Sequence, residues 1–83
     1  MRSIKTRNEN NMCYFCFWSE KYMDDLYFAY EQLNPLQRVY RKDFILRHIR
    51  RDCELVDNDN VTGAQVYRCR LCGHKLYVDM SLL

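Results

Sequence analysis

The sequence has few of the residues from which enzymes build phosphate-binding loops. Its 83 residues include only two glycines, Gly63 and Gly73, and one proline, Pro35. A glycine-rich loop that cradles phosphate is therefore excluded. The sequence also offers no Ser/His/Asp set and no H-x-E pattern of the kind found at catalytic zinc sites. We therefore expect no enzymatic activity and no small-molecule substrate.

Long apolar runs are also missing. Charged residues interrupt the chain every few positions, so it contains no stretch of about 18 apolar residues that could cross a membrane. The first eleven residues lack the apolar segment of a signal peptide. From these absences we expect an intracellular protein, cytoplasmic or nuclear, that does not bind membranes.

The charge balance excludes two further classes of protein. The formal net charge is only +2, which is too low for a histone-like polycation, and 48% of the residues are hydrophobic, which is too many for a disordered tail. The chain should therefore fold. A single small core gives little stability, so we expect a covalent or metal crosslink to support it.

Cysteines are the residues that can supply this crosslink. Four of the five form two C-x-x-C units, Cys13–Cys16 and Cys69–Cys72, separated by 52 residues. In a reducing compartment such pairs are thiols or metal ligands rather than disulfides. Each unit places two sulfurs on one side of the backbone, and two units complete the tetrahedral S₄ site that structural Zn²⁺ prefers. The sequence thus predicts one structural zinc ion held by Cys13, Cys16, Cys69 and Cys72.

The second unit also has a familiar local pattern. The segment from Val66 to Val78, with Cys69, Cys72 and Gly73, resembles the zinc-knuckle hairpin of zinc-ribbon and treble-clef proteins. Gly73 can take a positive φ where the chain turns back. The resemblance implies zinc binding, but it does not specify a function, because such modules serve many processes.

Two other side chains are alternative ligands. His48 and Cys53 are about one helical turn apart and could form a Cys₃His site with Cys13 and Cys16. We favour a different role for each: Cys53 as a buried thiol in the core, and His48 as a surface residue.

A third alternative ligand is His74, which lies two residues beyond Cys72 and could replace one of the cysteines. We favour a position for His74 beside the site or in solvent.

The pattern between the two cysteine pairs predicts two helices. Residues 20–33 lack glycine, proline and β-branched residues and repeat apolar positions at helical spacing. Asn34 suits an N-cap and Pro35 the first position of a second helix. The apolar residues of 36–53 do not form one stripe, so this helix is either buried on two sides or broken near Asp43.

The C-terminal third has the composition of β-structure. We expect strand-like segments at residues 54–56, 61–68 and 76–78, with a turn at 57–60. The prediction is an α+β fold, with two helices between an N-terminal zinc knuckle and a C-terminal antiparallel β-hairpin that carries the second knuckle. Residues 1–11 are predicted to be a flexible polar leader, and residues 12–83 a single zinc-binding domain.

Basic residues are concentrated in the middle of the chain. Residues 34–53 contain six basic and two acidic groups, and Arg47, Arg50 and Arg51 fall close together on a helix. With Arg70 they could contact the phosphates of DNA or RNA. The alternative is a solvated helix face whose cations pair with acidic residues of the preceding helix.

Aromatic residues are more numerous than a small core can readily hide. The twelve aromatic side chains predict an exposed apolar patch, and hence a protein partner or self-association. Two functions therefore stay open. One is a small nucleic-acid-associated factor in transcription or replication. The other is a protein-interaction or assembly adaptor. A compact chain of this kind would also suit a viral protein.

Overall fold

The computed structural model describes residues 12–83, and the predicted flexible leader of residues 1–11 lies outside this range. Two helices precede a three-stranded antiparallel sheet, which confirms the α+β class. In chain order the elements are α1 (Tyr14–Phe28), a 3₁₀ turn η2 (Tyr30–Gln32), α2 (Pro35–Asp52), β2 (Cys53–Asn58), β3 (Gln65–Cys69), β4 (Lys75–Val78) and a 3₁₀ turn η3 (Met80–Leu82).

Helix α1 begins six residues earlier than predicted. Cys13 is its N-cap residue and Tyr14 its first residue, so the first C-x-x-C pair lies at a helix N-terminus rather than in a turn that precedes a helix. Residues 14–18 are mostly aromatic, and aromatic residues have modest intrinsic helix propensity. Their rings pack against one another, and Phe15 packs against Phe44 of α2, so tertiary packing stabilises these extra residues of the helix.

Helix α2 begins where the sequence predicts. The side-chain oxygen of Asn34 accepts a hydrogen bond from the backbone amide of Gln37 (2.8 Å), and the side chain of Gln37 accepts one from the backbone amide of Asn34 (2.9 Å). These two bonds form a capping box, followed by Pro35 in the first turn. The helix continues unbroken past Asp43, because its apolar side chains pack on two sides. Ile45 lies in the core, and Phe44 contacts the rings of α1.

The sheet contains the predicted hairpin and a third strand, β2, which includes the strand-like segment predicted at residues 54–56. Its order is β2-β3-β4, with Cys53 opposite Cys69 and Tyr67 opposite Leu76. The β2–β3 turn falls after Asn58 rather than at 57–60, because the Asp59 carboxylate accepts the amide of Val61 (2.9 Å) and Gly63 supplies a φ of 80°. The predicted strand beginning at residue 61 is therefore wrong at its start.

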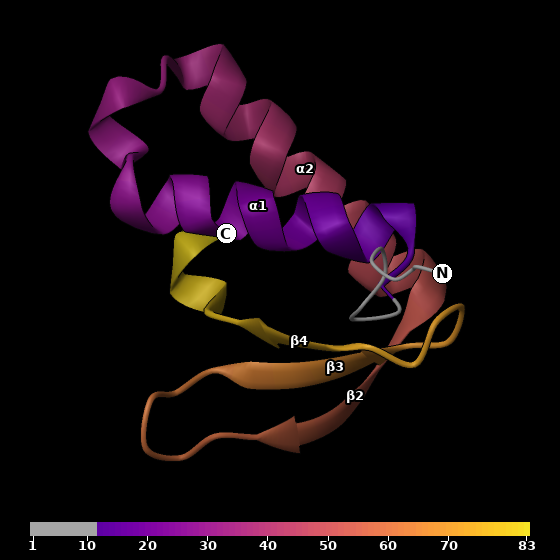
Figure 1. The fold of residues 1–83 in the computed structure, drawn as a ribbon. Helices are drawn as coiled ribbons and strands as arrows, with labels where there is room; N and C mark the ends of the chain where they lie inside the picture. Colours follow the sequence, from indigo (N-terminus) through magenta and orange to yellow (C-terminus); the bar gives the residue numbers. More distant parts are fainter. Residues whose placement is uncertain (1–11) are drawn as a thin grey trace, which may run out of the picture.

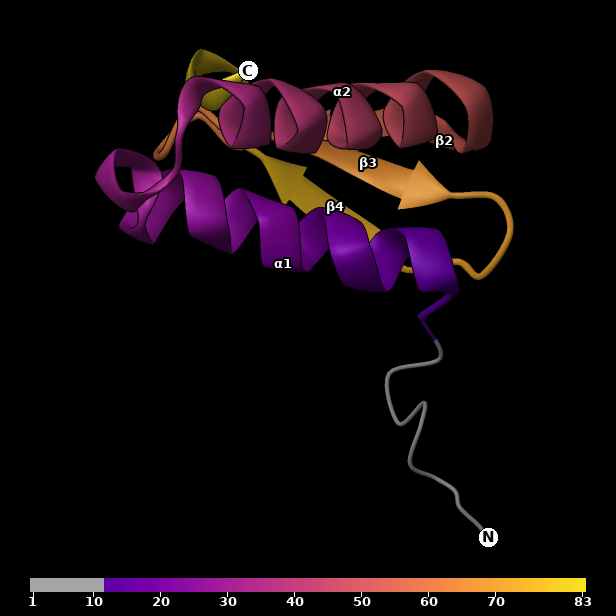
Figure 2. The same cartoon turned by 90° about the horizontal axis from the view of Figure 1, so that it is seen from above.

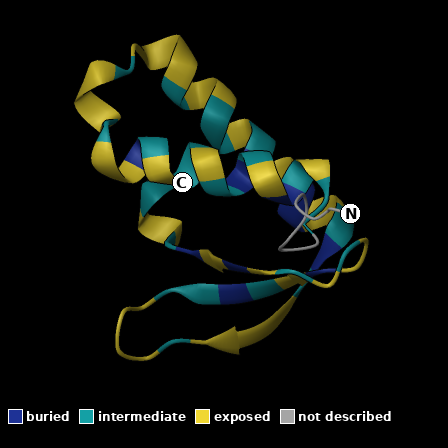
Figure 3. Cartoon of the chain, viewed as in Figure 1, coloured by how far each residue is buried: buried dark blue, intermediate teal, exposed yellow. Residues whose placement is uncertain are grey.

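Both helices lie on one face of the sheet (Figure 1, Figure 2). Buried residues from α1, α2 and the sheet form the core between them: Cys16, Leu26, Ile45, Ile49, Cys53, Cys69, Leu76 and Val78. Exposed positions dominate the connection between the two helices (Figure 3). The start of α1, the end of α2 and the β3–β4 connection meet at the opposite end of the helix pair, and we call this the knuckle end (Figure 1, Figure 2).

Within residues 12–83, none of the helices combines the length and the apolar character that a membrane crossing requires.

Candidate metal centre

Four potential ligands converge at the knuckle end. The thiols of Cys13, Cys16 and Cys69 and a ring nitrogen of His48 all lie within 4.8 Å of one another. They come from the start of α1, from α2 and from the end of β3. Such a group of soft sulfur and imidazole donors is close enough to hold a metal ion.

The N-terminus of α1 favours negative charge on its two cysteines. Cys13 is the N-cap residue and Cys16 lies in the first turn, where the unpaired amides and the positive end of the helix dipole stabilise thiolate. Cys16 is also fully buried. A buried thiolate without a cation would be costly, so this position requires either protonation or a metal.

The β3–β4 connection has the expected knuckle geometry. The amide of Cys69 donates to the carbonyl oxygen of His74 (2.9 Å), and the amide of Gly73 donates to that of Cys69 (2.8 Å). Gly73 has a φ of 79°, as the turn requires. The amide of Arg70 donates to the carbonyl oxygen of Asp52 (2.8 Å) and so joins the knuckle to the end of α2.

Cys72, the fourth predicted ligand, is not one of these four donors, but it contacts them. Its Sγ is 3.6 Å from Cys16 Sγ, and its thiol also interacts with those of Cys13 and Cys69. Burial raises the pKa of Cys72, but hydrogen bonds from the backbone amides of Cys13 and His74 and from neighbouring thiols outweigh burial and leave its pKa lowered. Amide donors of this kind stabilise a thiolate at a knuckle.

Burial has the opposite net effect on the first cysteine pair. It raises the pKa of both Cys13 and Cys16, and for Cys16 the neighbouring thiols raise it further. Without a cation these two sulfurs therefore keep their protons. A metal ion that binds here must displace protons, so its affinity falls as the pH falls.

His48 is buried in the cluster, so the prediction that it lies on the surface is wrong. It is 1% exposed, and its Nε2 is 3.3 Å from Cys16 Sγ. Its Nδ1 lies 3.1 Å from Asp52 Oδ2, and its ring stacks on Phe15 (centroids 5.6 Å apart). The sequence signal was present in the spacing: Ile45 and Ile49 flank His48 on the buried side of the helix, and Asp52 follows at i+4.

The other two alternative ligands are not among the four converging donors, although the Cys53 thiol contacts that of Cys69. Cys53 is 6% exposed and packs in the core opposite Cys69, as predicted for a buried thiol. Burial, with a further contribution from the neighbouring Cys69 thiol, raises the pKa of Cys53 to about 12, so it is a neutral thiol at physiological pH. The half-buried His74 lies 2.6 Å from Glu20 Oε2, which joins the knuckle to α1.

Most of the predicted phosphate-binding arginines have carboxylate neighbours. Arg47 pairs with Asp43 (2.9 Å), Arg51 with Asp52 (3.1 Å), and Arg70 approaches Glu54 (4.0 Å). Arg50 is exposed and forms no ion pair with any residue from 12 to 83. The alternative of pairing with the preceding helix is found once, between Arg41 and Asp25 (3.1 Å).

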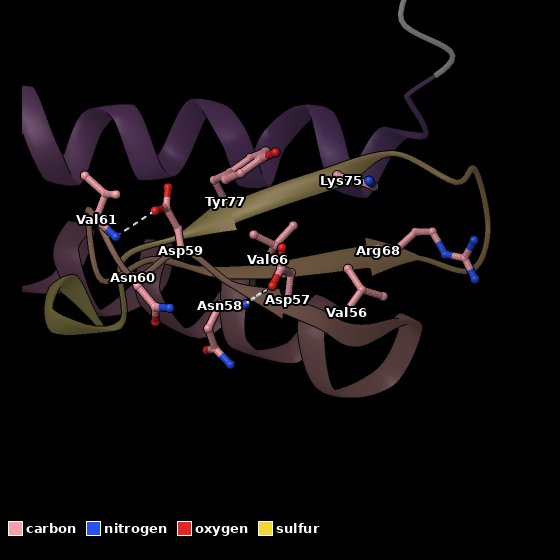
Figure 4. Close-up of a pocket in the computed structure, with 10 residues that line it drawn as sticks. All are labelled: Val56, Asp57, Asn58, Asp59, Asn60, Val61, Val66, Arg68, Lys75 and Tyr77. Carbon is pink, nitrogen blue, oxygen red and sulfur yellow. Dashed lines mark hydrogen bonds between the residues drawn. The ribbon is translucent and has the colours of Figure 1, made fainter.

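A cavity of about 780 Å³ lies over the outer face of the sheet, away from the cysteines (Figure 4). Val66 forms part of its lining, and the cations Arg68 and Lys75 border it. Its carboxylates accept hydrogen bonds from backbone amides: Asp57 from the amide of Asn58 (2.8 Å), and Asp59 from that of Val61 (2.9 Å). These bonds stabilise the β2–β3 turn.

Comparison of this chain with protein-family models, with curated proteins and with solved structures finds no match. The resemblance to zinc-ribbon and treble-clef knuckles thus stays a local one.

Proposed function

We propose that the protein is a non-catalytic module built around one structural zinc ion, and that its ligands are Cys13, Cys16, Cys69 and Cys72. The sulfur distances support this set. Two sulfurs bound to one tetrahedral zinc at about 2.3 Å lie about 3.8 Å apart. The distances of 3.9 Å from Cys13 to Cys69 and 3.6 Å from Cys16 to Cys72 lie on either side of this value.

In this proposal His48 is a neighbour of the zinc site rather than a ligand. A nitrogen and a sulfur bound to the same zinc would lie about 3.6 Å apart. The 3.3 Å between His48 Nε2 and Cys16 Sγ is shorter and suits a direct hydrogen bond. The Asp52 carboxylate holds the imidazole from its other side.

Metal analysis of purified variants tests the ligand set. We expect one zinc per chain in the parent protein, and loss of zinc in Cys13→Ser, Cys69→Ser and Cys72→Ser. Cys53→Ser is the matched control, because it removes a buried thiol that lies outside the proposed set. Loss of zinc in His48→Asn together with retention of zinc in Cys72→Ser would show that His48, and not Cys72, is the fourth ligand.

We further propose that the module is a small nucleic-acid-associated factor. The observation that carries this proposal is the exposure of Arg47, Arg50 and Arg51 along the last turns of α2, beside the knuckle that holds Arg70. An ion pair between exposed side chains contributes little, so Asp43 gives way readily to a phosphate at Arg47, whereas Asp52 beside Arg51 is only 13% exposed and also binds His48. With a net charge of only +2, binding should be weak and strongly salt-dependent.

A salt titration tests this function. We expect binding to mixed-sequence DNA and RNA at about 50 mM salt that weakens steeply by about 200 mM. Replacement of Arg47, Arg50 and Arg51 by Gln should reduce the slope of log affinity against log salt by about one for each phosphate that the variant no longer neutralises. Absence of any binding at low salt would rule out the proposal.

A second function, protein interaction, has its own supporting observation. Phe28 and Leu36 are 77% and 81% exposed at the connection between the helices, far from the cysteines. Sedimentation of the parent protein and of a Phe28→Ser, Leu36→Ser variant tests it. A parent that is monomeric at all concentrations and co-purifies with no partner would contradict it.

A further inference from the structure

Aromatic rings form a continuous row on the helix pair, which we call the aromatic ladder. Along α1, Tyr14 contacts Trp18 (centroids 6.5 Å apart) and Trp18 contacts Tyr22 (5.5 Å). Tyr22 then contacts two rings of α2, Tyr40 (5.8 Å) and Phe44 (5.1 Å). The ladder therefore starts at the knuckle end on α1 and crosses to α2.

The ladder has exposed rings at its ends and partly buried rings in its middle. The buried face of α1 carries Cys16, Ser19 and Leu26. Tyr14, Trp18 and Tyr22 recur at every fourth residue, and the buried Leu26 continues the same row, so the ladder borders the buried face at its Tyr22 end, where Tyr22 packs against the core. The two end rings are open to solvent, since Tyr14 is 66% and Tyr40 57% exposed.

Cations border the ladder. The guanidinium of Arg41 lies 5.1 Å from the centre of the Tyr22 ring. That of Arg51 lies 5.0 Å from the ring of Phe15, which contacts Phe44 of the ladder (centroids 6.2 Å apart). A pocket of about 150 Å³ opens at the knuckle end of this surface, with Phe15, Phe44, Arg47, His48 and Arg51 around it. Partly buried rings and guanidinium groups therefore meet on this surface, and the exposed Tyr14 joins it through its contact with Phe15 (centroids 5.4 Å apart).

We infer that this surface binds single-stranded nucleic acid, with bases stacked on Tyr14 and Tyr40 and phosphates at Arg47 and Arg51. Base stacking on aromatic side chains beside a positively charged track is how sequence-tolerant binders hold single strands. A duplex cannot use the ladder, because its bases are already stacked on each other. This inference rests on the proposed nucleic-acid function and adds the class of ligand and the face that receives it.

Trp18 provides the assay. It is the only tryptophan in the chain and lies in the middle of the ladder, so its fluorescence reports on a base that stacks nearby. The probes are a 20-nucleotide oligo(dT) and a 20-base-pair mixed DNA duplex at low salt. We expect oligo(dT) to quench Trp18 and to bind at least tenfold more tightly than the duplex.

Variants separate stacking from charge. Tyr14→Ala and Tyr40→Ala should each weaken oligo(dT) binding by about tenfold or more, without a change in its salt dependence. Tyr14→Phe keeps the ring and should bind like the parent. Tyr77→Ala is the matched control, because Tyr77 is 60% exposed but lies on β4, on the outer face of the sheet (Figure 4).

The possible outcomes distinguish this inference from the function on which it rests. If duplex and oligo(dT) bind equally and both tyrosine variants bind like the parent, the ladder is not the binding face, while the proposed nucleic-acid function stands. If neither probe binds at low salt, the proposed function fails and the inference fails with it. Binding of polyglutamate at this face, with no binding of oligo(dT), would also overturn the inference.

Discussion

Because of the Cys53 thiol, the stability of the fold should depend on pH in the alkaline range. Burial raises the pKa of this thiol from the ordinary 9.0 to about 12. The unfolded chain therefore loses this proton before the folded chain does, and stability should fall as the pH rises from about 9 toward 12. We predict that zinc-loaded Cys53→Ala shows a shallower decline over this range than the parent.

Urea denaturation at several pH values between 8 and 11 checks this prediction. The slope of unfolding free energy against pH is the quantity to compare, because the substitution also leaves a small cavity that lowers stability at every pH. Equal slopes in the two proteins would contradict the raised pKa.

The environment of Ser19 lowers the stability of the fold. Ser19 is fully buried in α1, and its hydroxyl has no hydrogen-bond partner among residues 12–83. A buried polar group without a partner costs about 1–3 kcal/mol, and alanine is also the better helix former. We predict that Ser19→Ala raises the free energy of unfolding by about 1 kcal/mol or more in urea denaturation.

Ser81 is the control for this substitution. Its hydroxyl donates to Asp79 (2.7 Å) at the exposed end of the chain, so Ser81→Ala should leave stability unchanged or slightly lower it. A loss of stability in Ser19→Ala would show that the hydroxyl has a partner after all.

Among the elements, α2 depends most visibly on one local motif. The reciprocal bonds of Asn34 and Gln37 satisfy backbone amides that the helix itself leaves unpaired. Asn34→Ala should therefore lower the free energy of unfolding by about 1 kcal/mol, and Asn34→Asp by much less. Thermal unfolding followed by circular dichroism measures both, and equal stability of Asn34→Ala and the parent would contradict the role of the cap.

The same helix shows what local sequence could predict. The Asn34–Pro35 pair indicates the start of α2 correctly because capping depends only on neighbouring residues. The predicted start of α1 is six residues late, since the rings of residues 14–18 gain their stability from α2, which follows in the chain. The predicted β2–β3 turn is misplaced because Asp59 and Gly63, rather than the first Asp-Asn pair, set its geometry.

For the whole molecule, the metal should decide whether the chain folds. Structural zinc contributes about 10–16 kcal/mol of apparent binding energy, as much as the whole stability of a typical domain. We predict that a zinc chelator at pH 7 abolishes the helical circular dichroism signal and that added zinc restores it, whereas magnesium does not. A native spectrum in fully metal-free protein would contradict this.

The two cysteine pairs could be recognised from sequence because each is a local pattern with a known preference for metal. The position of His48 beside the cysteines could not be predicted from the sequence, because it depends on how α2 packs against the start of α1. Once that packing is known, His48 joins Cys13, Cys16 and Cys69 in one group of donors, and Cys72 contacts this group as a fifth. A tetrahedral zinc needs four of these donors, and we assign all four to sulfur.

X-ray absorption at the zinc edge tests this assignment most directly. In the zinc-loaded protein we predict a single shell of four sulfurs at about 2.3 Å, unchanged in His48→Asn. A mixed shell of three sulfurs and one nitrogen at about 2.0–2.1 Å, lost in His48→Asn, would contradict the four-cysteine centre and make His48 a ligand.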